Sequence, residues 1–196
     1  MANYSKELTQ AIQDVDAEFP GETSSIPIMK FISAAESNYG RYNPETALSY
    51  GPFQIDPVRY YDIAQNPERI NQPRLDKANE FLRLKLDNPD FNISNLANYN
   101  PETKGYDDVN LDMMRNPHVG ATLTRLGLMQ DPGSLPGEEG LSNYYQNFWG
   151  PKWSQSEDEG YKATKRAEAQ DRYDRIPDYT MTDNVVTEQG SQAFDY

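Results

Sequence analysis

The sequence contains no cysteine and a single histidine, His118. The lack of cysteine excludes disulfides, thiolate nucleophiles and thiolate-ligated metals, and a single histidine excludes multi-histidine metal sites and disfavours a serine-histidine-aspartate triad. No run approaches 18 consecutive apolar residues, so we expect no membrane-spanning helix. We therefore expect no metal and no cofactor, and any catalytic chemistry must use carboxylates, hydroxyls and amides.

Basic residues are also scarce. The 196 residues include 18 Lys and Arg against 31 Asp and Glu, which gives a net charge of −13. Such a balance argues against nucleic acid as a partner, because phosphates repel an acidic surface. The first six residues lack a charged-then-apolar pattern, so we expect no signal sequence. Tyrosine is abundant, with 14 residues, and its apolar face with a polar tip suits sugar rings and wet grooves.

Apolar periodicity predicts a mainly α chain with no internal repeat. Helices are expected over residues 5–19, about 26–38, about 73–86 and about 138–149. Pro73 opens the third of these, and Asn116-Pro117 opens a further helix with Val119, Leu123 and Leu126 on its core stripe. Residues 40–60 are expected to be irregular or to form a short extended hairpin. Residues 87–110, rich in Asn, Asp, Pro and Gly, are expected to form a long loop.

The two ends of the chain are more polar than its middle. Residues 154–176 predict a charged helix with a thin apolar face, and residues 177–196 show no pattern and are expected to be largely disordered in isolation. We expect a helical arm over 1–25, one domain over 26–153, and a charged helix with an extended tail over 154–196.

Glu36 is the first candidate for chemistry. It lies at the end of the expected helix 26–38, where the helix dipole disfavours an anion, and Tyr39 and Phe53 are near enough in sequence to add desolvation. Both effects raise the pKa of a carboxyl, as a general acid at neutral pH requires. The alternative is an exposed glutamate in the last turn of a helix, without a function.

Two further segments could line a site with Glu36. In residues 49–55, Gly51-Pro52 imposes a turn that would hold the Gln54 amide between the apolar Phe53 and Ile55. The alternative is a plain turn with Gln54 on the surface. In residues 141–149, Tyr145 and Phe148 share the face of Leu141 and are expected in the core. Tyr144 lies at the edge of that face, where its hydroxyl could reach a cleft.

Together these segments resemble a known family. Residues 36–40 (Glu-Ser-Asn-Tyr-Gly) and 49–54 (Ser-Tyr-Gly-Pro-Phe-Gln) resemble the signature of soluble, lysozyme-like lytic transglycosylases. Residues 144–151, with Tyr144 and Gly150-Pro151, are similar to a late motif of the phage-associated branch, which supplies a tyrosine near the catalytic glutamate. The resemblance covers residues 26–153 apart from an insertion at about 62–110, and Asn147 stands where that branch often has histidine.

This resemblance implies a lysozyme-like fold, α+β with a minimal β element, and cleavage of the β-1,4 bond between N-acetylmuramic acid and N-acetylglucosamine in peptidoglycan. Glu36 would protonate the leaving oxygen and then help the muramoyl 6-hydroxyl close a 1,6-anhydro ring. Ser37 and Gln54 would hold the substrate or orient Glu36, and Tyr144 would place a hydroxyl near the acid. The implied substrate-binding residues are Ser37, Tyr39, Ser49, Gln54, Asn116 and Tyr144.

Three alternatives stay open at this stage. Water could attack in place of the 6-hydroxyl, which would make the enzyme a lysozyme, and Glu45 or Asp56 could then supply a second carboxylate. The domain could be an inactive lysozyme-like module in a virion structural protein whose polar arms do the work. It could also be a sugar-binding module without catalysis, since Tyr-rich grooves bind glycans well.

The acidic charge bears on where such an enzyme would act. Peptidoglycan is itself rather anionic, so a free protein of net charge −13 would not be steered toward it. We therefore expect a phage virion protein, made in the bacterial cytoplasm and carried to the peptidoglycan by the particle. Its partners would be glycan strands and, through the two arms, other virion proteins.

Overall fold

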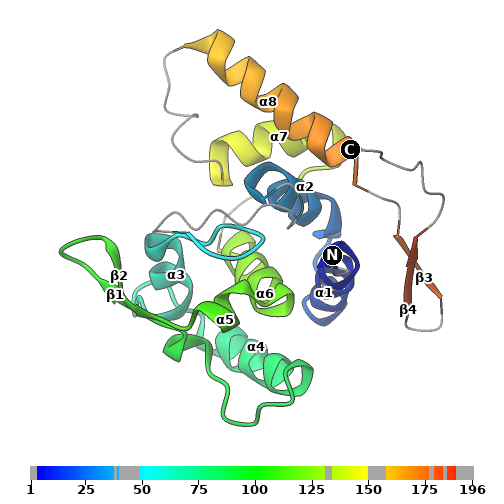
Figure 1. The fold of residues 1–196 in the computed structure, drawn as a ribbon. Helices are drawn as coiled ribbons and strands as arrows, with labels where there is room; N and C mark the ends of the chain where they lie inside the picture. Colours follow the sequence, from blue (N-terminus) through cyan, green and yellow to red (C-terminus); the bar gives the residue numbers. More distant parts are fainter. Residues whose placement is uncertain are drawn as a thin grey trace.

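The computed structural model describes residues 4–37, 39, 49–130, 134–149, 158–176, 179–182 and 185–188. Its α-helices are α1 (Tyr4–Glu18), α2 (Ile26–Ser37), α3 (Pro57–Ala64), α4 (Gln72–Lys85), α5 (Leu111–Arg115), α6 (Pro117–Leu128), α7 (Leu141–Tyr144) and α8 (Glu159–Asp174). Strands β1 (Ala97–Asn100) and β2 (Gly105–Val109) form one antiparallel hairpin, and β3 (Tyr179–Thr182) and β4 (Val185–Glu188) form another. The prediction of a mainly α chain is confirmed (Figure 1).

Helix α6 is the centre of the core. Every residue from Val119 to Leu126 is buried, and α1, α3, α4 and α5 pack around the helix (Figure 1). Because these consecutive buried residues fall on every side of the helix, several elements must converge on it to cover them. Asn116 caps its first turn by accepting hydrogen bonds from the backbone N–H of His118 and Val119, and Pro117 occupies the first helical position.

Helix α1 belongs to this core, which corrects the expectation of a separate arm over residues 1–25. Leu8, Ile12 and Val15 are fully buried, and α1 packs along α6. Asp14 joins three helices, because its carboxylate accepts hydrogen bonds from Lys85 of α4 (2.6 Å) and His118 of α6 (3.0 Å). The apolar stripe of α1 is thus buried against the rest of the domain.

Residues 87–110 are not a long loop, as the composition predicted. They hold a short 3-10 helix, Ile93–Asn95, and the hairpin β1–β2, and α5 follows directly. The asparagines that favour a loop reading serve as caps and turns. Asn92 caps the 3-10 helix, Asn110 caps α5, and Asn100 accepts hydrogen bonds from the backbone N–H groups of the hairpin turn.

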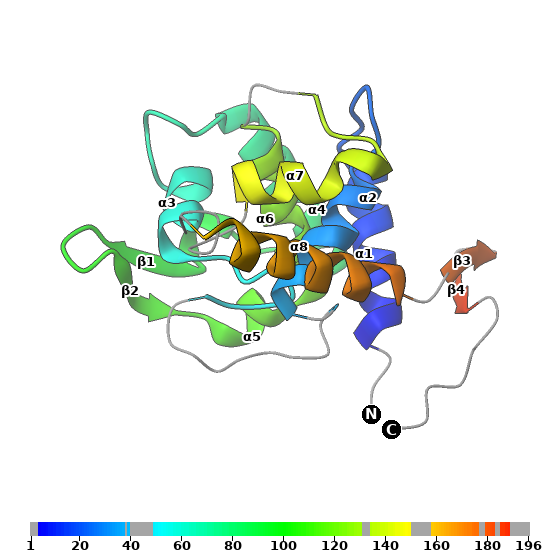
Figure 2. The same cartoon turned by 90° about the horizontal axis from the view of Figure 1, so that it is seen from above.

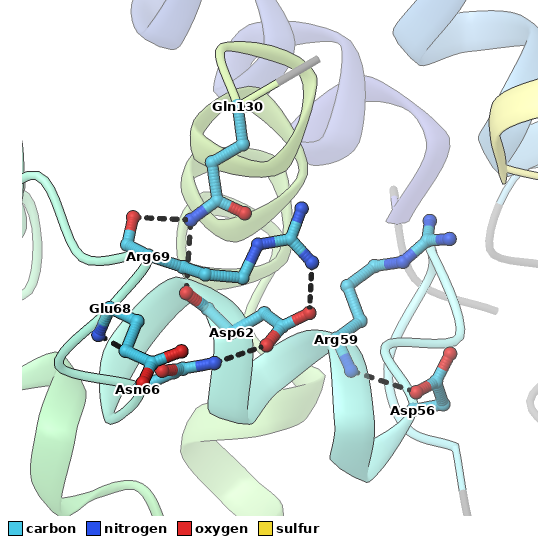
Figure 3. A network of polar contacts seen from close by, with 7 residues as sticks. All are labelled: Asp56, Arg59, Asp62, Asn66, Glu68, Arg69 and Gln130. Atoms are coloured by element: carbon cyan, nitrogen blue, oxygen red, sulfur yellow. Dashed lines mark hydrogen bonds and ion pairs between the residues drawn. The ribbon is translucent and has the colours of Figure 1, made fainter.

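Helix α3 was also not expected. Asp56 accepts a hydrogen bond from the backbone N–H of Arg59, and Pro57 opens the helix, so the start of α3 repeats the cap-and-proline arrangement of α6. Its other end is fastened to the end of α6 through Asp62 and Gln130 (Figure 3). Both ends of α3 are therefore fixed.

The C-terminal part of the chain packs on α2. The helix expected over 138–149 is a 3-10 turn (Glu138–Gly140), α7, and a π-helical turn (Tyr145–Trp149). The charged helix expected within 154–176 is α8, and it lies alongside α2 (Figure 2). The tail after it, expected to be disordered, includes the hairpin β3–β4. Within the described residues, no helix is long and apolar enough to cross a membrane.

Candidate functional site

Glu36 lies in the last turn of α2, as predicted, and faces a cavity of about 250 Å³. The cavity is bounded by α2, by Tyr145 of the π-helical turn and by one face of α8. Withdrawal of the carboxyl from water raises the pKa of Glu36 to about 7, although the hydrogen bond from Tyr145 and the positive charge of Arg59 lower it. A carboxyl of this kind is available in both protonation states near neutral pH, which a residue acting as acid and then as base requires.

Tyr145 is the residue that touches the acid. Its hydroxyl donates a hydrogen bond of 2.8 Å to Oε1 of Glu36. The ring is 2% exposed and packs edge-on against Phe31 of α2, with ring centres 5.7 Å apart. Phe31 in turn contacts Tyr173 of α8 at 5.5 Å. The phenol is thus held by an aromatic cluster that joins α2, α8 and the π-helical turn.

The sequence assigned this contact to Tyr144, and that assignment is wrong. Tyr144 is 8% exposed and lies in the core near Arg125 of α6. The spacing predicts that the face with Leu141 and Tyr145 is a core face. In the structure α7 and the π-helical turn pack on α2, which also carries Glu36. The core face and the site face are therefore the same. The π-helical turn begins at Tyr145, and such turns are frequent at functional sites.

Ser37 connects the end of α2 to the turn of residues 49–55. Its hydroxyl donates to the backbone carbonyls of Pro52 (2.6 Å) and Ser33 (3.1 Å), and the residue is 1% exposed. The prediction allowed Ser37 either to hold the substrate or to orient Glu36. These hydrogen bonds fix the turn against the helix that carries Glu36, and a substrate contact by Ser37 stays a prediction.

Two glycines let this turn approach the core. Gly51 has φ +77°, and a Cβ at this position would collide with the backbone carbonyl oxygen of Met114. A Cβ on Gly120 would lie 3.1 Å from the ring of Phe53. The turn is closed by reciprocal backbone hydrogen bonds between Tyr50 and Ile55. The expected turn is therefore present and rigidly seated.

The other predicted substrate-binding residues have mixed outcomes. Gln54 is half-buried, and its Nε2 donates to the carbonyl of Gly51 (2.8 Å), so at least one of its donors stabilises the turn. Tyr39 is 3% exposed and its hydroxyl shares a hydrogen bond with Thr9, which places it in the core rather than at a substrate. The side-chain oxygen of Asn116 is occupied as the cap of α6. Ser49 is half-buried beside the turn, and its role toward a substrate stays a prediction.

Asp56 is the second carboxylate near Glu36. Its negative charge acts on Glu36 and raises the pKa of that carboxyl, whereas Arg59 on the next turn of α3 acts in the opposite direction. Figure 3 shows both residues at the start of α3, where the backbone N–H of Arg59 donates to Asp56 at 2.9 Å. The other candidate, Glu45, lies outside the described residues.

Helix α8 supplies the part of the site that the sequence did not predict. Tyr161, Lys165, Glu168, Ala169 and Arg172 line the cavity. These positions follow the three- and four-residue spacing of one helix face, but mostly polar residues occupy them, so the face gave no apolar signal. Arg172 donates to the carbonyl of Ala35 (3.0 Å), which fastens α8 to the residue next to Glu36.

Exposed groups on α8 could contact a ligand in the cavity. Tyr161 is 45% exposed, and the ammonium of Lys165 lies 5.8 Å from the centre of its ring. Lys165 also pairs with Glu168 at 2.7 Å. An exposed aromatic face beside hydrogen-bonding groups is the kind of surface that binds a sugar ring. Among the described residues, no group of three or more acidic or histidine side chains is placed to hold a metal.

Comparison with protein-family models, with curated proteins and with solved structures finds no match to this chain.

Proposed function

We propose that this chain is a peptidoglycan lytic transglycosylase with a lysozyme-like fold, in which Glu36 is the single acid and base. The observation that carries the proposal is the state of Glu36: a carboxyl at a helix end, facing a cavity, with a pKa of about 7 and a hydrogen bond from Tyr145. The match of residues 36–40 and 49–54 to the transglycosylase pattern gives this acid its substrate class.

The reaction begins with Glu36 in its protonated form. Its proton passes to the glycosidic oxygen as the bond from that oxygen to C1 of the muramoyl residue breaks. The carbonyl oxygen of the 2-acetamido group stabilises the cationic centre at C1, so that a second protein carboxylate is not required. The carboxylate of Glu36 then takes the proton from the muramoyl 6-hydroxyl while that oxygen bonds to C1. The product is a 1,6-anhydro ring, and Glu36 is protonated again.

Tyr145 serves this cycle in both halves. Its hydroxyl donates to the carboxylate form of Glu36, so it stabilises the charge that develops as the proton leaves. The same bond keeps the pKa of Glu36 from rising further than desolvation alone would raise it. Ser37 contributes indirectly by tying the end of α2 to the turn that carries Gln54.

The first experiment is the lysis of purified peptidoglycan by the wild-type chain and by Glu36→Gln. Glutamine has nearly the same shape but can neither donate nor accept the catalytic proton, so lysis should be abolished while the helical circular dichroism is unchanged. Full lysis by the variant would overturn the assignment of Glu36. Binding of glycan without cleavage by the wild-type chain would favour a sugar-binding module instead.

A true lysozyme is the second candidate, and Asp56 is the observation that favours it. The charge of Asp56 is felt by Glu36, and two-carboxylate hydrolysis requires such a neighbour. Asn also caps helices well, so Asp56→Asn removes the charge while the start of α3 is kept. Retained activity supports the single-carboxylate scheme, and abolished activity supports hydrolysis.

We further propose that the protein acts from a phage particle on the peptidoglycan of the host. The net charge of −13 would oppose capture of an anionic polymer by the free protein, and delivery by a particle removes the need for such capture. Proteomic detection of the chain in purified virions tests this directly. Potent lysis by the free protein at low concentration and physiological salt would argue against it.

A further inference from the structure

A second cavity, of about 440 Å³, lies away from Glu36. Its wall includes Pro20, Arg74, Arg125, Leu128, Met129 and Leu135, from the loop before α2, the first turn of α4, and the end of α6 with the segment after it. That loop leads into the start of α2, whereas Glu36 lies in the last turn, about 15 Å farther along the helix at 1.5 Å per residue. The two cavities share no lining residue.

Arg125 is the buried cation of this cavity. It is 4% exposed, and its Nε and Nη2 donate to the carbonyl of Phe19 at 3.0 and 2.7 Å. Within the described part of the chain, Nη1 makes no hydrogen bond, and no carboxylate lies within 4.0 Å of the guanidinium. A buried charge without a counterion is costly. The Phe19 carbonyl offsets only part of that cost.

A second guanidinium lies at the same cavity. Arg74 donates through Nη1 to the carbonyl of Met129 (2.9 Å), which leaves other donors on its fork. Burial lowers the pKa of Arg125, the charge of Asp16 raises it, and the charge of Arg74 lowers it, so the two cations repel each other. Arg69, a short way along the chain, is paired with Asp62 at 2.7 Å. Within the described residues, Arg74 and Arg125 thus line one cavity without such a carboxylate partner.

Neither acid nearby forms an ion pair with these arginines among the described residues, although the negative charge of Asp16 raises the pKa of Arg125. Asp16 accepts a hydrogen bond from the hydroxyl of Ser24 (2.9 Å). It also accepts hydrogen bonds from the backbone N–H (2.6 Å) and the hydroxyl (2.7 Å) of Ser25, so both of its carboxylate oxygens already have hydrogen-bond donors. Glu22 lines the cavity but is exposed and makes no ion pair among the residues that the structure describes. Glu22 could therefore compete with an anionic ligand for the two arginines, but it is not paired with either of them among the described residues.

We propose that this cavity binds a small ligand that carries a carboxylate or phosphate group on an apolar stem. The oxyanion would accept from Nη1 of Arg125 and from the free donors of Arg74, as planar guanidinium forks suit such groups. The apolar stem would lie against Leu128, Met129 and Leu135. This site is independent of the proposed reaction at Glu36, and neither stands or falls with the other.

The test is calorimetric titration of the full-length chain at constant ionic strength with three probes: 4-methylpentanoate, its neutral amide, and inorganic phosphate. We expect saturable binding of at least one anion and none of the amide. Whichever anion binds more tightly identifies the ligand class. Absence of saturable binding by both anions, or equal binding of the amide, would overturn the proposal.

Variants locate the binding without disturbing the buried arginine. Arg74 is exposed, so Arg74→Ala should fold and weaken the binding of the anion at least fivefold. Arg69→Ala, which removes the same charge from the neighbouring surface, should leave the affinity unchanged. Glu22→Gln should strengthen binding, because it removes the competing carboxylate. Equal affinity in wild type and Arg74→Ala would contradict the assigned site.

Discussion

The hydroxyl of Tyr145 donates a hydrogen bond of 2.8 Å to Oε1 of Glu36, a residue 109 positions earlier in the chain. This bond joins α2 to the π-helical turn that follows α7, two segments that also pack on each other. It also sets two opposed effects on one carboxyl, because desolvation raises the pKa of Glu36 and the phenol lowers it. Changes at either residue should therefore alter the pH dependence of activity.

Replacement of Tyr145 by Phe should move the pH profile and lower the rate. Loss of the donated hydrogen bond leaves desolvation to act alone, so the pKa of Glu36 should rise above about 7. The fall in activity toward alkaline pH, which reports loss of the acid form, should shift to higher pH. Turnover should drop about tenfold or more, because a hydrogen bond to a charged group contributes about 1.5–3 kcal/mol. Turbidity assays across pH 5–9 measure both effects.

The matched control is Tyr144→Phe. Tyr144 lies in the core near Arg125, so this variant should keep the pH profile of the wild type. A larger effect of Tyr144→Phe than of Tyr145→Phe would show that the contact between Tyr145 and Glu36 does not matter for the reaction.

Helix α8 should raise the pKa of Glu36, because it covers the cavity and keeps water from the carboxyl. Ala169 is 5% exposed at the cavity wall, and Gln at this position should push α8 away from α2 without adding a charge. Water would then reach Glu36, so its pKa should fall toward 4.5 and the alkaline limb of activity should move to lower pH. Ala167→Gln, on the exposed face of the same helix, should change nothing. An unchanged profile in Ala169→Gln would remove α8 from the site.

Asp56→Asn distinguishes one carboxylate from two. Removal of the negative charge that raises the pKa of Glu36 should shift the alkaline limb slightly to lower pH. Turnover below that limb should remain within a fewfold of the wild type. A loss of a thousandfold or more, with unchanged thermal stability, would instead assign Asp56 a direct catalytic role.

The cluster around Asp14 should govern stability in acid. Burial opposes ionisation, but the hydrogen bonds from His118, Lys85 and Gln10 together lower the pKa of Asp14 to about 2. A depressed carboxyl pKa contributes stability that is present above the unfolded-state value of 3.8 and is lost as pH falls from there toward 2. Because the group is partly exposed, about 1 kcal/mol is expected after allowance for screening.

Urea unfolding of Asp14→Asn and of the wild type at pH 7 and pH 2.5 measures this contribution. The two proteins should differ at pH 7, and the difference should be clearly smaller at pH 2.5, near the end of the window. A difference that is the same at both pH values would mean that the amide cannot replace the carboxylate for reasons other than charge.

The parts of the fold that could be predicted have strong local signals. Helices α1, α2, α4 and α6 each carry a continuous apolar stripe, and Asn116-Pro117 marks a start that the structure confirms. Helix α3 has the same start signal in Asp56-Pro57 but only eight residues, too few for a clear period. Residues 87–110 were misread because Asn residues that cap short elements have the composition of a loop.

The site could be predicted only where one residue type is decisive. Glu36 could be singled out because the helix end that carries it is combined with the motif resemblance of residues 36–40 and 49–54. The choice between Tyr144 and Tyr145 depends on which side of α7 faces α2, and this is a property of packing rather than of sequence spacing. The face of α8 that lines the cavity is mostly polar, so the sequence has no apolar stripe that would predict its contact with the site. Both the Tyr145 contact and the α8 wall of the cavity therefore depend on long-range packing, which local sequence patterns do not predict.

The most direct test of the central claim is mass spectrometry of the products released from purified peptidoglycan by the wild-type chain and by Glu36→Gln. We predict 1,6-anhydromuropeptides from the wild type and no released muropeptides from the variant. Identical products from both proteins, or no cleavage by the wild type under conditions in which it is folded, would contradict the assignment of Glu36 as the acid and base of a lytic transglycosylase.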